Sequence, residues 1–499
     1  MSAEWLEFQL GERCNVKSSK RIFAHEYVDF GIPFMRSKDV IEKALGTFID
    51  YDLHISEERF FEIKKTHGSP KKSDLLISSV GNRSGQPYVI KDEGDFHFKD
   101  GNILWLSEFS DINSDYLAYW IKSDIGQESL ASVMIGSAQK ALTIDSLRKL
   151  WLKFPTIDNQ NKIAEIFLSL DNKIQLNRQI NQTLESMAQA IFQSWFVDFD
   201  PVKAKIAARE QWQILTDDER TEWLNGLLET QDYFKTCLSE LTANGEQSAS
   251  EILYLNIAAM TAISSRDETS LADMPGAEFV QLYKTASLFP ERLLESELGE
   301  MPEGWSVGIL GDLIEFNPRR TLKKGTVAPY LDMKNVPTSG HLADEVLDRE
   351  LGSGTKFING DTLLARITPC LENGKTAFVD FLEDNQVGWG STEYIVMRPK
   401  ANLPVSLGYF IARNEEFRQH AVQSMTGTSG RQRANAKTLE ILDWLIYPID
   451  LLLAFNELSE RYLRIAKTNG GQSKVLGEIR DVLLPKLLSG ELIKIEKSV

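Results

Sequence analysis

The chain repeats part of its own sequence, and this duplication constrains the fold more than any other feature. Residues 5–11 (WLEFQLG) are matched by residues 305–311 (WSVGILG), 300 positions later. Four more short matches follow in the same order, with offsets between 287 and 300: 32–35 with 328–331, 74–77 with 361–364, 136–137 with 427–428, and 154–155 with 447–448. Five matches in one order predict a tandem duplication of about 200 residues.

Each copy begins with short apolar runs separated by Gly, Pro, Asn and Asp. Residues 72–81 (KSDLLISSVG) and 357–361 (FINGD) have this character. Such runs predict strands joined by turns, and the pattern of residues 114–122 predicts a helix among them. We therefore expect a domain of mixed strands and helices over residues 1–153 and a second one over residues 301–446.

A long helix is expected after each mixed domain, over residues 154–200 and 447–499. In both segments, seam residues recur at alternating steps of four and three, which favours a coiled coil over a lone amphipathic helix. They are Ile163, Phe167, Leu170, Ile174, Asn177, Asn181, Leu184, Ala188, Ile191 and Trp195, then Leu451, Phe455, Leu458, Tyr462, Ile465, Asn469, Gln472, Leu476, Ile479 and Leu483. Two such helices in one chain most simply pair with each other, antiparallel. The expected fold class is α+β, a pseudo-twofold tandem repeat.

Polar residues interrupt both seams at similar depth. They are Asn177 and Asn181 in the first seam, and Asn469 and Gln472 in the second. Buried Asn at such positions fixes the register and the number of partners in a coiled coil. The alternative interpretation is a solvated stretch of an ordinary helix.

Residues 201–300 have no counterpart after the second helix and carry most of the negative charge. They hold 8 basic and 18 acidic side chains, a net charge of −10 out of −17 for the whole chain. Acidic patterns such as residues 217–224 (DDERTEWL) predict helices. We expect an acidic helical insert or connector here. The other 399 residues carry a net charge of −7, which leaves room for local basic patches.

The sequence lacks the short motifs of common enzyme classes. It has no GxxxxGK[ST] phosphate loop, no HExxH motif and no GxSxG elbow. The three cysteines, at positions 14, 237 and 370, are too far apart to suggest a zinc site. No secretory leader and no apolar stretch of membrane length are recognisable. We therefore expect a non-catalytic, cytoplasmic protein with no metal or cofactor of its own.

Two Gly-rich polar loops stand at matched places in the two copies. Residues 425–435 (MTGTSGRQRAN) and 134–141 (MIGSAQKA) offer side chains that suit DNA, because Arg and Lys contact guanine edges or phosphates and Gln reads adenine. The candidate DNA-binding residues in these loops are Thr428, Ser429, Arg431, Gln432 and Arg433, and Gln139 and Lys140. Further candidates are Arg36 and Lys38, Arg83 and Ser84, and Arg319 and Arg320. For each cluster the alternative is an ordinary solvated surface.

Several longer motifs resemble those of one protein family, the specificity (S) subunits of type I restriction-modification systems. These motifs are residues 170–185 (LDNKIQLNRQINQTLE), 192–203 (FQSWFVDFDPVK), 288–305, and 484–492 (LPKLLSGEL). The resemblance covers the chain except about residues 205–285, and it is strongest in the helical segments. The insert is longer and more acidic than this family leads one to expect.

The resemblance implies that residues 1–153 and 301–446 are target-recognition domains, each contacting one half of a bipartite site in double-stranded DNA. The two helices would set the spacing between the half-sites. Two methyltransferase subunits and the ATP-dependent restriction subunits would be the partners, and S-adenosylmethionine, ATP and Mg²⁺ would belong to them. The chain itself would recognise DNA and hold the complex together without catalysing a reaction or contacting a membrane.

Three questions stay open at this point. Trp195, Phe196 and Phe199, near the end of the first helix, are expected to face a partner subunit, although they can equally pack on their own domain. The acidic insert is either a docking element or a spacer with local helical packing, and we favour the spacer. The alternatives for the whole chain are a specificity subunit of a related system that only methylates, and a self-contained DNA-modifying enzyme.

Overall fold

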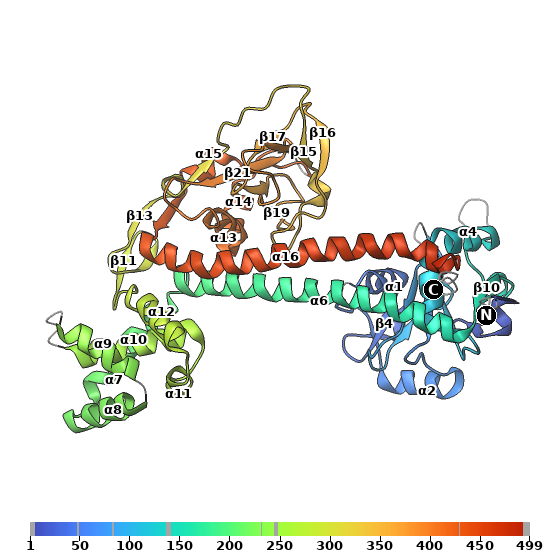
Figure 1. Cartoon of the computed structure of the whole chain (residues 1–499), viewed down its shortest axis with the longest axis horizontal. Coiled ribbons are helices and arrows are strands. Elements are labelled where there is room, and N and C mark those ends of the chain that lie inside the picture. The colour runs from blue at the N-terminus through green and yellow to red at the C-terminus, as the bar shows by residue number, and fades with distance from the viewer. Residues whose placement is uncertain are drawn as a thin grey trace, which may run out of the picture. The chain divides into compact units, whose positions relative to one another are not determined.

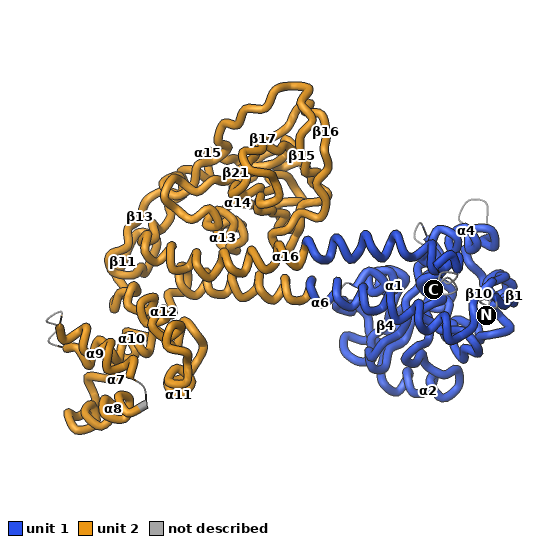
Figure 2. Tube along the Cα trace, viewed as in Figure 1, with its two compact units in different colours: residues 1–177, 471–499 blue, residues 178–470 orange. Residues whose placement is uncertain are grey.

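The computed structural model of the chain (Figure 1) describes residues 5–46, 49–81, 84–135, 141–230, 232–243, 248–428 and 430–492. It divides into two compact units, which Figure 2 colours separately. One unit holds residues 1–177 and 471–499, and the other holds residues 178–470. Each unit therefore contains one mixed domain and a part of both long helices.

The first mixed domain contains two four-stranded sheets and a two-stranded ribbon in which β1 (Trp5–Gln9) pairs antiparallel with β10 (Trp151–Pro155). One sheet has the order β2-β9-β6-β7, with β2 (Asn15–Lys17), β6 (Leu75–Ser78), β7 (Pro87–Val89) and β9 (Ile103–Ser107). The other has the order β3-β5-β4-β8, with β3 (Tyr27–Val28), β4 (Ile32–Met35), β5 (His54–Ile55) and β8 (His97–Phe98). The helices are α1 (Ser37–Ala44), α2 (Glu57–His67), α3 (Ser114–Lys122), α4 (Asp124–Val133) and α5 (Ile144–Arg148). The helix predicted at 114–122 is thus α3, which begins at an Asn113 cap.

The second mixed domain has the same plan. Its ribbon pairs β13 (Ser306–Ile309) with β22 (Asp443–Ile446), antiparallel. One sheet has the order β14-β21-β18-β19, with β14 (Ile314–Phe316), β18 (Thr362–Ala365), β19 (Thr376–Phe378) and β21 (Tyr394–Pro399). The other has the order β16-β15-β20-β17, with β15 (Val327–Leu331), β16 (Leu347–Glu350), β17 (Thr355–Phe357) and β20 (Gly388–Gly390). The helices are α13 (Leu407–Arg413), α14 (Glu415–Gln423) and α15 (Ala436–Glu440).

The repeat extends to individual hydrogen bonds. Asp74 precedes β6 and Asp361 precedes β18, as the matched sequences predict. Each carboxylate accepts a bond from the backbone N–H three residues earlier, from Lys71 and Ile358 respectively, at 2.9 Å in both cases. β6 and β18 also have equivalent neighbours on both sides in their antiparallel sheets. The predicted tandem repeat is confirmed.

The two long helices pair antiparallel, as expected. They are α6 (Ile157–Phe196) and α16 (Ile449–Leu488), of 40 residues each. In one unit, Asn177 Nδ2 donates to Gln472 Oε1 at 2.9 Å. In the other, Asn181 Nδ2 donates to the Ala466 carbonyl and Asn469 Nδ2 donates to Asn181 Oδ1, both at 2.9 Å. The polar seam residues therefore bond across the helix pair and do not mark a solvated stretch.

Both helices contribute to the core of each mixed domain. In the first unit, Leu488 near the end of α16 is buried in one cluster with Phe8, Phe154 and Phe167. In the second unit, Phe192 near the end of α6 is buried with residues of the second mixed domain. Each domain is thus completed by the helix that follows the other copy in sequence.

The acidic segment folds into a compact helical domain. Its helices are α7 (Asp200–Ile214), α8 (Asp217–Thr230), α9 (Asp232–Ala243), α10 (Ala249–Ser264), α11 (Glu268–Ala272) and α12 (Gly276–Ser287), followed by the hairpin of β11 (Leu293–Ser296) and β12 (Gly299–Pro302). Helices α8 to α12 enclose an apolar core of their own. Ile206 and Ile263 also pack against the core of the second mixed domain, and Gln281 Nε2 donates to Glu457 Oε2 of α16 at 2.8 Å. The expected local helical packing is observed, and the insert also packs against the rest of its unit. Its role as a spacer stays a prediction.

Truncating Leu488 is expected to destabilise the first mixed domain, although this residue lies more than 300 positions away from it in sequence. The side chain is 4% exposed, and Leu→Ala in a core costs about 2–5 kcal/mol. L488A should therefore speed amide hydrogen exchange in β1, β10 and α3. The neighbouring control V482A changes a side chain that is 57% exposed and should leave these rates unchanged. Equal rates in L488A and wild type would contradict the shared core.

A second prediction concerns Lys205 of α7, which is 2% exposed and donates Nζ to the Phe289 carbonyl at 2.7 Å. Burial lowers the pKa of Lys205 from 10.5 to about 8. Between these values the unfolded chain keeps a proton that the folded chain has lost, so the contribution of Lys205 to stability rises with pH.

The measurement is the free energy of unfolding in urea at pH 7 and pH 9.5, for wild type, K205M and the exposed control K203M. From pH 7 to 9.5, wild type should gain about 2 kcal/mol relative to K205M. Relative to K203M it should gain nothing. The same pH dependence in all three chains would show that Lys205 titrates normally.

Candidate nucleic-acid interface

The two polar loops predicted to bind DNA occupy equivalent places in the structure. One connects α4 to α5 and the other connects α14 to α15. Each is closed at its base by a pair of antiparallel backbone hydrogen bonds, between Ile135 and Ala141 at 2.9 and 3.0 Å, and between Thr426 and Arg433 at 2.9 and 3.1 Å. Candidates Gln139, Lys140 and Ser429 lie outside the described residues.

A second pair of equivalent backbone hydrogen bonds attaches the two loops to their sheets. Just after β6, the Ser79 carbonyl accepts a bond from Leu142 N at 3.0 Å. Just after β18, the Arg366 carbonyl accepts a bond from Ala434 N at 2.8 Å. Equivalent strand ends therefore hold equivalent loops, and the pairing of the loops inferred from sequence holds in three dimensions.

The side chains of the second loop differ in their exposure to solvent and in their bonds within the protein. Thr428 and Arg431 are exposed, and the Arg431 N–H bonds to the Thr428 carbonyl at 3.0 Å in a turn. Gln432 is half-buried and binds Thr368 through its backbone. Arg433 donates to both carboxylate oxygens of Glu393 at 2.7–3.0 Å. Arg431 is thus the loop cation most available to an external ligand.

In the first domain, the remaining candidates that the structure describes also have partners within the protein. Arg36 and Lys38 both donate to Asp52, at 2.6 and 3.1 Å. The Ser84 hydroxyl is half-buried and contacts the sulfur of Met134 at 3.9 Å, beside the base of the first loop. Arg83 lies outside the described residues. Ser84 thus contacts the described part of the loop segment, whereas Arg36 and Lys38 pair with Asp52.

Arg319 and Arg320 are adjacent in sequence but differ in environment. Arg319 is exposed. Arg320 is 17% exposed and pairs at 3.1 Å with Asp361, which is fully buried and also pairs with Arg398 at 3.3 Å. Its guanidinium neutralises a buried carboxylate at the start of β18, so Arg320 has a partner within the protein. Its contact with DNA stays a prediction.

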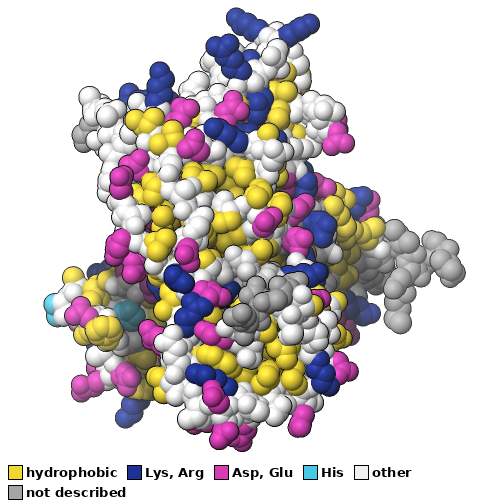
Figure 3. Space-filling view, turned by 90° about the vertical axis from the view of Figure 1, so that its left-hand side faces the viewer, with side chains coloured by type: hydrophobic (Ala, Val, Ile, Leu, Met, Phe, Trp, Pro, Cys, Tyr) yellow, Lys and Arg dark blue, Asp and Glu magenta, His cyan; other side chains and the backbone are white. Residues whose placement is uncertain are grey.

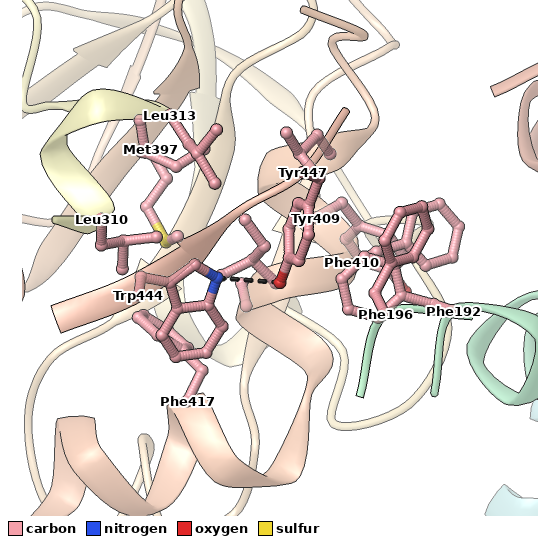
Figure 4. Packing of buried hydrophobic residues seen from close by; sticks show 14 of the residues in the cluster. Phe192, Phe196, Leu310, Leu313, Met397, Tyr409, Phe410, Phe417, Trp444 and Tyr447 are labelled. Carbon is pink, nitrogen blue, oxygen red and sulfur yellow. Dashed lines mark hydrogen bonds between the residues drawn. The ribbon is translucent and has the colours of Figure 1, made fainter. Parts of the chain in front are cut away.

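The expectation that Trp195, Phe196 and Phe199 face a partner is corrected in favour of the alternative, packing within the protein. Their exposed fractions are 1%, 1% and 7%. Phe196 packs against Tyr447 with ring centroids 4.8 Å apart, and Phe199 packs edge-on against Trp305 at 5.5 Å. Figure 4 shows Phe192 and Phe196 of α6 beside Phe410 and Tyr447. These rings leave water by entering the core of the second mixed domain, so they are not available to a partner.

Two residues at the base of the second loop were not among the sequence candidates. Glu393, just before β21, holds Arg433, and its pKa lies below its ordinary value because Arg433 donates to it. Arg366, just after β18, bonds through its backbone N–H to the Glu393 carbonyl at 2.9 Å. The repeat is the signal that could have led to them, because Arg366 and Glu393 correspond to Ser79 and Asn102 of the first domain, which make the same backbone hydrogen bond.

Within the described residues, no group of three or more His, Cys, Asp and Glu side chains is placed to hold a metal ion. Nor does any helix of that part of the chain combine the length and apolar character needed to cross a membrane.

Replacing Asp361 by Asn is expected to destabilise the second mixed domain. The change leaves two guanidinium groups, of Arg320 and Arg398, beside a neutral side chain in the core, and removing one partner of a buried ion pair costs about 3–5 kcal/mol. Urea unfolding of D361N should show a loss of this size. The control D348N, on exposed strand β16, should unfold like wild type. A D361N chain as stable as wild type would contradict a stabilising role of the ion pairs of Asp361 with Arg320 and Arg398.

Comparison with known proteins finds similar sequences and structures. The family model "Type I restriction modification DNA specificity domain" matches residues 2–186. The HindI type I restriction enzyme specificity subunit of Haemophilus influenzae is 23% identical over 507 residues, covering 98% of this chain and all of that protein. The EcoAI specificity subunit of Escherichia coli is 29% identical over 169 residues, 32% of this chain and 28% of that one. A crystal structure of a type I S subunit from M. genitalium superposes with a TM-score of 0.49 and 11% identity, covering 97% and 96% of the two chains. Over nearly its whole length the chain is therefore similar to a type I restriction enzyme specificity subunit, and residues 2–186 match the specificity-domain model.

Proposed function

We propose that this chain selects the DNA sites of a type I restriction-modification complex. Each mixed domain acts as a target-recognition domain for one half of a bipartite site. The observation that carries the proposal is the duplicated loop: equivalent strand ends hold a polar loop in both domains, while the loop sequences differ. A shared framework with variable side chains suits the reading of two different half-sites by base contacts.

The paired helices α6 and α16 support a fixed distance between the half-sites. Each has 40 residues, which is about 60 Å of helix. Hydrogen bonds from Asn177, Asn181 and Asn469 across the pair oppose sliding of one helix along the other. We infer that the helix pair sets the length of the nonspecific spacer in the DNA site.

The chemistry of methylation and cleavage is assigned to partner subunits. Two methyltransferase subunits suit a chain in which the mixed domain, the polar loop and the long helix each occur twice, and restriction subunits complete the complex. S-adenosylmethionine, ATP and Mg²⁺ belong to these partners in the proposal. The chain itself contributes recognition and assembly and no catalysis.

The charge of the chain supports the proposal that this chain and its partner subunits both contribute to DNA binding. The chain carries a net charge of −17, and basic and acidic side chains are interspersed on the face shown in Figure 3. Affinity for DNA rises with the number of phosphates that basic side chains neutralise. We therefore propose that local cations such as Arg431 position the DNA and that the methyltransferase subunits are needed for tight binding.

Lengthening both helices by one heptad is the direct test of this function. The insertions follow Asn177 and precede Gln472, which face each other, and each carries the seam pattern. Seven residues add about 10 Å, equivalent to up to about 3 base pairs. Mapping methylated adenines in cells that co-express the methyltransferase subunit should return unchanged half-sites separated by a longer spacer.

The matched control inserts the heptad into α6 alone. It shifts the seam of one helix only, so it should abolish methylation through loss of helix pairing. An unchanged spacer in the double insertion would contradict the proposed role of the helices. If wild type gave no bipartite motif at all, the proposed function would be wrong.

A further inference from the structure

A second inference, which rests on the proposed function, comes from comparing the positions at which the two polar loops close and attach to their sheets. Three positions are equivalent by backbone bonding: Ser79 and Arg366 after β6 and β18, Asn102 and Glu393 before β9 and β21, and Ala141 and Arg433 at the loop closure. The N–H of the first residue donates to the carbonyl of the second at 2.9 Å in both domains. The backbone framework is therefore the same.

The side chains on this framework differ in chemistry. In the first domain, the Ser79 hydroxyl is used internally, donating to the Gly101 carbonyl at 2.9 Å, and Ala141 has no polar group. In the second domain the same three positions hold two guanidinium groups and one carboxylate. We name Arg366, Glu393 and Arg433 the loop-base cluster.

Glu393 fixes the orientation of Arg433. Nε of Arg433 lies 3.0 and 2.9 Å from the two carboxylate oxygens, and Nη2 lies 2.7 Å from one of them. Among the residues that the structure describes, the remaining terminal nitrogen, Nη1, makes one long contact, at 3.5 Å with the Arg431 carbonyl. The Arg433 side chain is 43% exposed. Glu393 thus holds one edge of the guanidinium and leaves Nη1 for an external acceptor.

Arg366 adds an unsatisfied donor at the same place. Its Nε is buried and has no hydrogen-bond partner among the described residues. A buried donor without an acceptor costs free energy that an incoming acceptor removes. The loop-base cluster carries a net charge of +1, and the exposed Arg431 next to it adds another positive charge. These groups match an anionic or acceptor-rich ligand.

We propose that Arg366 and Arg433, oriented by Glu393, form a DNA contact that is present in the second target-recognition domain and absent from the equivalent place in the first. The contacted acceptors are either the O6 and N7 atoms of a guanine or the oxygens of a phosphate. Glu393 is the positioning residue. Because the first domain has Ser79, Asn102 and Ala141 at these positions, this contact distinguishes the second half-site.

The test uses the complex of the full chain with its methyltransferase subunit and a duplex carrying the site found by methylation mapping. Variants R433A, R433K, R366M and E393Q are compared with K437Q, which removes one exposed positive charge on neighbouring helix α15. Thermal unfolding identifies any variant that fails to fold. Arg433 is partly exposed, so R433A and R433K keep the test valid if R366M or E393Q unfolds.

We expect R433A to weaken binding of the cognate duplex by about tenfold or more, with E393Q and R433K intermediate and K437Q close to wild type. If the contact is to a guanine, wild type and R433A should bind with equal affinity to a duplex in which that G·C pair of the second half-site has been changed. If it is to a phosphate, R433A weakens binding to all sequences alike and reduces the slope of log affinity against log salt by about one.

Folded loop-base variants that bind like wild type would overturn the inference, and so would an equal loss in K437Q, which would show an effect of net charge alone. Both results leave the proposed function intact, because wild type would still recognise a bipartite site. A wild-type complex that recognises no such site would instead overturn the proposed function.

Discussion

The structure depends on apolar side chains at the ends of the two long helices, which fill the core of the domain encoded by the other copy. In the second unit, Phe192, Trp195 and Phe196 of α6 are buried against Trp305, Tyr447 and Phe455. In the first unit, Leu488 of α16 is buried with residues of β1, β10 and α6. Burial of large side chains is the main favourable term in folding. Neither copy therefore contains all of its own core.

Polar contacts between the helices add specificity to this apolar packing. Asn177, Asn181 and Asn469 bond across the pair, and Arg480 pairs with Asp171 at 2.9 Å. A shift of one helix along the other would leave these groups without partners in a partly buried seam, which costs free energy. Apolar contacts alone tolerate several registers, whereas the amides and the ion pair select one.

The helices and the repeat could be predicted from sequence because both signals are periodic. Alternating steps of three and four identify a seam whatever the rest of the fold does, and a matched order of short motifs identifies a duplication. The orientation of single side chains could not be predicted this way. The sequence alone does not show that Trp195 and Phe196 are buried, because the residues that cover them belong to the second domain. Nor does it show that Arg320 pairs with Asp361, 41 residues away.

The candidate DNA-binding site, too, could be predicted from the sequence only in part. The loops at 134–141 and 425–435 were identified because they occupy matched places in the repeat. Glu393 and Arg366 were missed because each is an ordinary charged residue at a strand end, and their relation to Arg433 arises only when β18, β21 and the loop meet. The acidic insert, with no repeat partner to guide interpretation, was expected only as helices, and its packed core depends on contacts between helices that no local pattern describes.

The burial of Leu488 in the first domain has a consequence for how the chain is made. Domains generally fold as they emerge during synthesis, yet the first mixed domain lacks part of its core until the last helix has been translated. While residues 178–470 are synthesised, the apolar surface that receives Leu488 stays exposed to water. The domain that is synthesised first is thus the last to obtain its complete apolar core.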